Sequence, residues 1–274
     1  MKALTPREVQ LGELEVMKAL DAICEKLGLK YFLTYGTLLG AIRHQGFIPW
    51  DDDVDVMMPR PDYEKLLAYL MEHEEEIKPL KLMHYKTNKK YIYPIARLCD
   101  TRYWIDYQGA ADYGLGLFVD IYPLDGCGDT PEEAAKIMER SQKSVSMIDL
   151  AGKDKFYPSA SGGAIRNVAK FLAYCYGKMI GVTHFTAKLD KQGKKRPYES
   201  KFVNLTVWYT SVRRPFERAW FEEIVRMQFE DAMLCVPAHY DEILKRCYGD
   251  YMKLPPEDQQ IAHHYYTAYL KEDC

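Results

Sequence analysis

The sequence lacks closely spaced cysteine pairs. Its 7 cysteines form an odd set without a CxxC pair, which excludes a zinc ribbon and a small disulfide framework. The first thirty residues carry charges throughout and no apolar segment, so we expect no signal peptide. We therefore expect reduced thiols in the cytoplasm, several of them buried as small apolar side chains.

Long apolar runs are missing as well. The most apolar stretch, residues 171–182, is short and contains Lys178, whereas about twenty apolar residues are needed to cross a bilayer. We therefore expect a buried helix there rather than a membrane span. The sequence also contains no internal repeat and no low-complexity tract.

The whole chain has no strong excess of either charge. With 37 basic and 40 acidic side chains among 274 residues, the net charge is −3, which gives no reason to expect a nucleic-acid partner. The distribution is uneven, because residues 151–226 hold 15 Lys/Arg and 6 Asp/Glu, a net of +9. Either a solvated lysine-rich loop or a basic surface facing the phosphates of a lipid leaflet, a polyanionic acceptor or a nucleotide fits this segment.

The composition is that of an ordinary folded protein, 47% hydrophobic and 28% charged. Hydrophobic periodicity and turn residues predict both helices and strands without strict βαβ alternation, which favours an α/β or α+β fold. We expect helices at 11–27, 61–74, 131–150, 164–180 and 239–248, and a short one opening at 38–42. Strands are expected at 30–34, 53–57, 80–85, 92–98, 103–107, 117–122, 199–212 and 229–236, and loops at 126–130 and 188–199.

The most chemically loaded segment holds four carboxylates in five residues, at positions 51–53 and 55. These groups repel one another unless cations compensate them. On a strand, Asp53 and Asp55 would project from one face while Val54 and Val56 enter the core. Two carboxylates about 7 Å apart at a strand end suit a hard cation such as Mg²⁺.

A further acid, Asp120, interrupts the apolar strand 117–122, where burial is costly unless the carboxylate is bound or paired. One interpretation is that residues 51–53 cap a turn and Asp120 meets an arginine. The other is that the acids hold a metal that positions a phosphate-bearing substrate. Gly36 and Thr37, upstream of these acids, fit the second interpretation, since glycine admits a phosphate close to backbone amides and a hydroxyl adds a donor.

Several motifs closely resemble the LicD family of phosphotransferases. They lie at residues 35–44, 46–55, 58–63, 118–126 and 248–256. The resemblance implies a nucleotidyltransferase-like mixed sheet core flanked by helices, with an additional helical and basic insertion. It also implies one domain over residues 1–274, with the core at about 11–130, the helical and basic segment at about 131–225 and a C-terminal motif segment at about 226–274.

Carried over to this sequence, the family's catalytic and metal-binding carboxylates match Asp53, Asp55 and Asp120. The implied cofactor is Mg²⁺, with Mn²⁺ as the alternative. Gly36 and Thr37 match a glycine–hydroxyl pair that contacts the substrate.

Arg43 and His44 are placed to bind substrate phosphate. Arg43 is favoured because a guanidinium makes bidentate contacts, whereas His44 could equally make a structural hydrogen bond with the turn at Gly46. Of His263 and His264, at most one is expected to contact the donor, since adjacent helical side chains point in different directions.

The resemblance implies transfer of phosphorylcholine, or a related phospho-alcohol, from a CDP-alcohol donor such as CDP-choline. The implied acceptor is a hydroxyl of a cell-surface glycan or a lipid-linked glycopolymer, that is, lipopolysaccharide or a teichoic-acid precursor. The alternatives are a nucleotidyltransferase that consumes a nucleoside triphosphate, a fukutin-like polyol-phosphate transferase and a non-catalytic nucleotide-binding module. We expect a cytoplasmic protein without a nucleic-acid partner, and peripheral contact with the inner membrane leaflet is left open.

Choline recognition would need an aromatic cage, because cation–π contacts hold quaternary ammonium groups. The 22 tyrosines make such a cage available. The sequence leaves open which of Tyr85, Tyr91, Tyr93, Tyr103, Trp104, Tyr107 and Tyr113 would build it.

Overall fold

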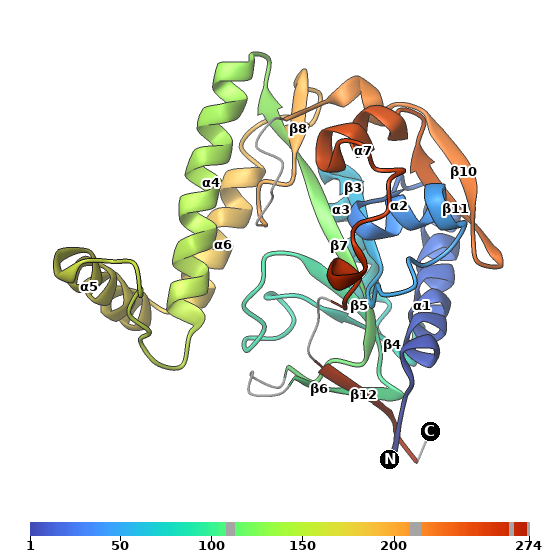
Figure 1. The fold of residues 1–274 in the computed structure, drawn as a ribbon, viewed down its shortest axis with the longest axis horizontal. Helices are drawn as coiled ribbons and strands as arrows, with labels where there is room; N and C mark the ends of the chain where they lie inside the picture. Colours follow the sequence, from blue (N-terminus) through green and yellow to red (C-terminus); the bar gives the residue numbers. More distant parts are fainter. Residues whose placement is uncertain (108–112, 209–214, 263–265, 273–274) are drawn as a thin grey trace.

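A mixed β-sheet forms the centre of the computed structural model, which describes residues 1–107, 113–208, 215–262 and 266–272 (Figure 1). Its main path runs through β2 (Phe32–Leu33), β3 (Asp55–Pro59), β7 (Leu117–Gly128), β5 (Ala96–Asp100) and β4 (Leu80–Met83). The short strands β8 (Phe202–Asn204) and β9 (Phe216–Glu217) extend it from β7. β3 and β7 are parallel, and this register places Asp55 opposite Asp120.

Three helices from the first part of the chain accompany this sheet: α1 (Pro6–Leu27), α2 (Tyr35–His44) and α3 (Arg60–Glu72). A capping box between Thr5 and Glu8 starts α1, and Gly28 ends it in the left-handed conformation. Leu14, Met17 and Leu20 of α1 are fully buried. The helical periodicity of the sequence therefore buries one face of α1 against the sheet.

A helical arm stands to one side of the sheet in Figure 1. It consists of α4 (Pro131–Gly152), α5 (Ala164–Ile180) and α6 (Val182–Gly193). α6 lies along α4, whereas α5 projects away from the rest of the molecule. None of the helices in the described ranges combines the length and the apolarity needed to cross a membrane.

The remaining elements complete the molecule. The hairpin of β10 (Ile224–Phe229) and β11 (Ala232–Pro237) precedes α7 (Tyr240–Tyr248). Short 3₁₀ turns occur at Arg218–Phe221 and Glu257–Gln259. β1 (Lys2–Ala3), β12 (Tyr266–Leu270) and β6 (Tyr103–Tyr107) form a small antiparallel sheet near the chain ends.

The mixed sheet with flanking helices confirms the predicted α/β (α+β) class, and α5 coincides with the helix expected at 164–180. Several local expectations were wrong. The loop expected at 126–130 begins within β7, which runs to Gly128. Only Phe202–Asn204 of the strand expected at 199–212 is a strand among the described residues, and 209–212 lie outside them. The loop expected at 188–199 begins with the last turn of α6, and the strand at 229–236 is a hairpin.

Another wrong expectation concerns the apolar stretch at 171–182. It lies mostly in α5, where Gly177 alone among the 17 residues of that helix is buried. An apolar periodic pattern predicts a helix with one apolar face, but it does not say whether another element covers that face.

Candidate active site

The site is built where the N-terminal turn of α2, the loop before β3 and strand β7 meet. Parallel pairing of β3 with β7 sets the carboxylates of Asp55 and Asp120 on adjacent strands, 6% and 4% exposed. Val54 and Val56 point into the core as predicted, and both are fully buried. Asp55 at the beginning of β3 and Asp120 in β7 therefore lie side by side.

The pKa of Asp55 is strongly perturbed. Burial, and then the charges of Asp53 and Asp120, raise its pKa well above the ordinary value. Its Oδ1 atom is buried and has no hydrogen-bond partner among the described residues. A buried carboxylate oxygen that lacks a donor and lies among other acids is a place where a cation is stabilised.

Asp120 has a protein partner. Arg97 of β5 donates to it from both Nε and Nη2, with Nη2–Oδ2 at 3.1 Å, and the Tyr122 hydroxyl lies 3.5 Å from Oδ2. The structure therefore contains the pairing of Asp120 with an arginine that one interpretation of the sequence predicted. Each carboxylate oxygen has a second lone pair, so this pairing leaves metal ligation by Asp120 as a prediction.

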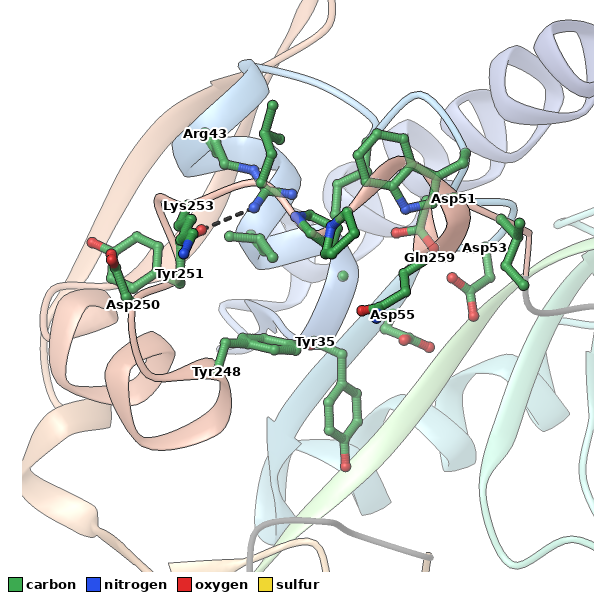
Figure 2. Close-up of a pocket in the computed structure, with 18 of the residues that line it drawn as sticks. Tyr35, Arg43, Asp51, Asp53, Asp55, Tyr248, Asp250, Tyr251, Lys253 and Gln259 are labelled. Atoms are coloured by element: carbon green, nitrogen blue, oxygen red, sulfur yellow. Dashed lines mark hydrogen bonds between the residues drawn. The ribbon is translucent and has the colours of Figure 1, made fainter.

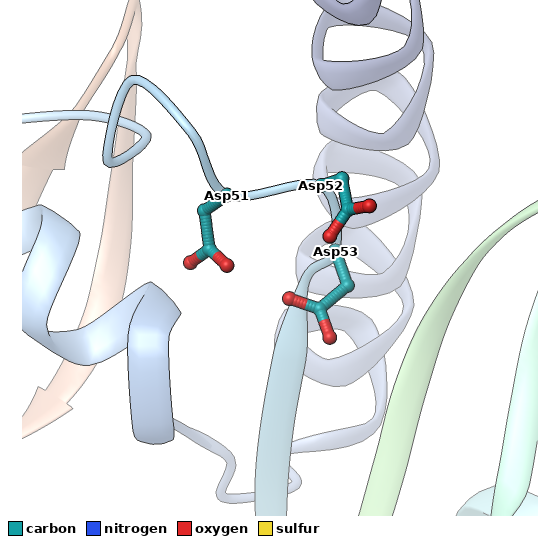
Figure 3. Close-up of side chains that lie close together, drawn as sticks. All are labelled: Asp51, Asp52 and Asp53. Atoms are coloured by element: carbon teal, nitrogen blue, oxygen red, sulfur yellow. The ribbon is translucent and has the colours of Figure 1, made fainter. Parts of the chain in front are cut away.

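Asp51, Asp52 and Asp53 form a second acidic group in the loop before β3 (Figure 3). One oxygen from each carboxylate lies within 4.8 Å of those of the other two, which is a spacing that a metal ion could bridge. Gln10 and Tyr266 hold the loop from outside, donating to the carbonyls of Asp51 and Asp52 at 2.8 Å. The sequence predicted Asp53 together with Asp55 and Asp120, whereas this grouping joins Asp53 to its two neighbours.

Glu13 of α1 is an acid whose position the sequence reasoning missed. Its side chain is fully buried although it is an acid, and Oε2 has no partner among the described residues. Burial, and then the charges of Asp53 and Asp52, raise the pKa of Glu13 well above the ordinary value. Tyr266, which donates to its Oε1 at 3.3 Å, comes from the other end of the chain, so no local pattern could have indicated this contact.

Hard oxygen donors of this kind fit Mg²⁺ or Mn²⁺. The fit follows from the oxygens of Asp55 and Glu13 that lack a partner among the described residues, and from the acids gathered beside the Arg97–Asp120 pair. Asp53, Asp55 and Asp120 are the ligands expected from the sequence, and one carboxylate oxygen each of Asp51 and Asp52 lies within 4.8 Å of one of Asp53.

We expect added Mg²⁺ to stabilise the protein more at pH 8 than at pH 5. The folded pKa values of Asp55 and Glu13 are raised, so the folded state binds more protons than the unfolded state, and stability falls as pH rises above the ordinary carboxyl range. A cation that binds the ionised carboxylates offsets that loss. The difference in melting temperature with Mg²⁺ and with chelator, at matched ionic strength, measures this effect, and a difference independent of pH would contradict it.

Gly36 and Thr37 separate into two roles. Gly36 lines the cavity, and a Cβ atom there would lie 2.3 Å from Asp51 Oδ2, so a larger residue would displace the Asp51 carboxylate from this position. Thr37 is 2% exposed, and its Oγ1 accepts a hydrogen bond from the backbone N–H of Asp55 at 2.9 Å. Thr37 therefore fixes the first residue of β3.

A cavity of about 850 Å³ opens in front of these acids (Figure 2). Asp51, Asp53 and Asp55 line one side, and Arg43 and Lys253 bring positive charge to the other. The aromatic lining consists of Tyr35, Trp50, Tyr248 and Tyr251. None of the seven aromatic residues considered from the sequence lines this cavity.

Arg43 ties α2 to the C-terminal segment. Its Nη1 donates to the carbonyl of Tyr251 and its Nε to His44 Nε2, each at 2.9 Å. Burial, and then the charge of Arg43, lower the pKa of His44. His44 is not among the lining residues, so its observed contact is with Arg43, and a phosphate contact of either side chain remains a prediction.

The C-terminal segment 248–261 supplies about half of the cavity wall. The sequence motif at 248–256 singled out this region, but the reasoning named only His263 and His264 from it, and both lie outside the described residues. The sequence reasoning missed Lys253 and Gln259. Both line the cavity, and their side chains can donate hydrogen bonds to a phosphate.

Comparisons with known proteins agree with these motifs. Residues 28–133 match the family model described as LicD/FKTN/FKRP, nucleotidyltransferase domain. The chain is 29% identical over 284 residues to the lipopolysaccharide cholinephosphotransferase LicD of Haemophilus influenzae, covering 98% of this chain and 100% of the relative. An uncharacterized protein of Rickettsia prowazekii is 41% identical over 61 residues, which is 22% of this chain and 23% of that protein. Together these matches confirm the resemblance to the LicD family that the motifs predicted.

Proposed function

We propose that this chain transfers phosphorylcholine from CDP-choline to a hydroxyl group of a lipopolysaccharide-type glycan, with the aid of Mg²⁺ or Mn²⁺. The observation that carries the proposal is the pair Asp55–Asp120 beside a cavity that also presents Arg43 and Lys253. The similarity to a lipopolysaccharide cholinephosphotransferase along nearly the whole chain supports the choice of donor and acceptor.

The cation would be held by Asp53 and Asp55, with Asp120 as a further ligand, and it would neutralise charge on the diphosphate of the donor. Arg43 and Lys253 face the phosphate oxygens from the opposite wall. The aromatic residues of the wall would contact the quaternary ammonium group of choline.

In the reaction, the acceptor oxygen bonds to the phosphorus of the phosphorylcholine group while the P–O bond to CMP breaks. Either Asp55 or Asp120 could accept the hydroxyl proton. We favour Asp55, because it lines the cavity, whereas Asp120 does not and both of its oxygens accept hydrogen bonds from Arg97. We also place the protein in the cytoplasm.

The test is CMP release from CDP-choline with choline-free lipopolysaccharide as the acceptor, with Mg²⁺ and with a chelator. We expect turnover that depends on the cation and is lost in Asp53→Ala. Asp231→Asn serves as the matched control, because this exposed acid pairs with Lys18 away from the cavity.

Competing donors separate the alternatives. Preference for CDP-ribitol or CDP-glycerol would indicate a polyol-phosphate transferase, and pyrophosphate release from a nucleoside triphosphate would indicate a nucleotidyltransferase. Binding of CDP-choline without turnover in any acceptor mixture would contradict the enzymatic proposal.

A further inference from the structure

Helix α5 turns its apolar side toward solvent. Five residues at helical spacing, which we call the apolar stripe, are between 52% and 88% exposed: Ile165, Val168, Leu172, Tyr176 and Met179. Exposed apolar side chains are normal when scattered, but a continuous row along one helix marks an interaction surface. The row follows the 3–4 spacing that places side chains on one helix face.

Contacts on the other side of α5 fix this orientation. Gly177 packs against Met147 and Ala151 of α4, where a Cβ would lie within 3 Å of both side chains. Lys170 donates to the carbonyl of Tyr157 at 2.8 Å, and Tyr174 to that of Asp154 at 3.0 Å. The polar and small residues of α5 thus face the protein and leave the apolar stripe uncovered.

Asn167 adds to the same attachment. Its Nδ2 donates to the carbonyl of Gly162 at 2.9 Å, and its Oδ1 accepts from the N–H of Ser159 at 2.8 Å. The loop at 153–163 is therefore bound to the protein-facing side of α5. A rotation of α5 that buried the apolar stripe would break these hydrogen bonds.

The charge of α5 indicates which kind of partner binds the apolar stripe. The helix contains Arg166, Lys170 and Lys178 and no acidic residue. A second copy seated on the apolar stripe would bring two such helices together, and their like charges would repel. An anionic surface would instead attract them.

Aromatic rings and lysines also meet around α5 in the manner expected at a membrane–water interface. Lys155 lies over Tyr157, Lys170 over Phe156 and Lys178 over Tyr174, at 5.8, 5.8 and 5.6 Å from the ring centroids. Lys170 is already bonded to the protein, but Lys155 and Lys178 can keep their stems against apolar groups while the ammonium reaches polar headgroups. At 17 residues, α5 spans about 26 Å and is suited to lie in the interface rather than cross it.

We propose that α5 docks the protein on an anionic lipid bilayer through its apolar stripe. Docking would hold the arm at the membrane and leave the cavity beside β3 and α7 free, since α5 lies at the outer end of the arm (Figure 1) and supplies none of the residues that line the cavity. That this brings the cavity close to a lipid-linked acceptor rests on the proposed function, whereas the docking itself does not.

The test is co-flotation of the full chain with vesicles of phosphatidylcholine alone or with about one-third phosphatidylglycerol. We expect the wild type to partition at least about tenfold more onto the anionic vesicles. Leu172→Glu/Met179→Glu should lower that partitioning at least about tenfold, because it places two charges in the apolar stripe. Arg166→Gln/Lys178→Gln should reduce binding to the level seen on neutral vesicles.

Met233→Glu is the matched control, since Met233 is an exposed methionine, 51% exposed, on the hairpin β10–β11. It should float as the wild type does, and all variants should retain the wild-type melting temperature. Absence of the wild type from the anionic vesicles would overturn the proposal. A dimer that Leu172→Glu/Met179→Glu dissociates, with no vesicle binding, would overturn it in favour of a second copy. Vesicle binding needs neither donor nor acceptor, so failure here is separate from failure of the proposed function.

Discussion

Replacing Asp55 by Asn is expected to lower turnover of CDP-choline roughly a thousandfold, by removing a charge that supports the transition state. The same variant should melt at a higher temperature than the wild type in cation-free buffer at neutral pH. The two effects have one cause, because the charge that would hold the cation is also the charge that the fold accommodates at a cost. Activity and stability are thus expected to change in opposite directions at this position.

The structural basis is the surroundings of Asp55. Its pKa is raised by burial and by neighbouring carboxylates, so ionising it in the folded state is unfavourable without a cation. Asn has nearly the same shape, and its amide can donate to a neighbouring acid. The backbone N–H of residue 55 keeps its hydrogen bond to Thr37 Oγ1, so the beginning of β3 is undisturbed.

Steady-state CMP release and thermal unfolding, each with Mg²⁺ and with chelator, measure both effects. Asp231→Asn, an acid at the surface, is the control for the chemical change itself. Turnover within about tenfold of the wild type would remove Asp55 from the cation site. A lower melting temperature without cation would show that its carboxylate stabilises the fold.

Asp55 in β3 and Asp120 in β7 illustrate how much of this site could be predicted from the sequence. Asp55 and Asp120 were both recognised from their apolar surroundings and from the family motifs. The sequence did not contain the parallel register of β3 and β7 that sets them opposite each other, because that pairing joins segments far apart in the chain. Arg97, which completes the arrangement, lies on a third strand and carries no motif of its own.

Glu13 and α5 show the complementary limit. Helical periodicity predicted both helices, but burial depends on what packs against each face. Glu13 is covered by the acidic loop and by Tyr266, whereas the apolar stripe of α5 is left exposed. A local pattern reports which residues share a face, and only the tertiary structure decides whether that face is inside.

Replacing Arg97 by Met is expected to lower the free energy of unfolding by about 3–5 kcal/mol, the largest loss of stability that we expect from a single substitution. The guanidinium is the partner of Asp120 and lies 4.1 Å from the centroid of the Phe118 ring, in a nearly inaccessible position. Met fills a similar volume but leaves the carboxylate of Asp120 buried beside that of Asp55. The loss therefore comes from an uncompensated charge more than from lost packing.

A double-mutant cycle isolates this effect. Arg97→Met/Asp120→Asn removes both charges, so it should recover a large part of the stability that Arg97→Met loses in urea unfolding. Arg97→Lys should fall between the wild type and Arg97→Met, because lysine keeps the charge but cannot make the two-pronged contact. Lys143→Met, which breaks an exposed pair with Glu139, should leave the urea midpoint unchanged. If the double variant were as unstable as Arg97→Met, packing of the guanidinium, and not its pairing with Asp120, would be its main contribution to stability.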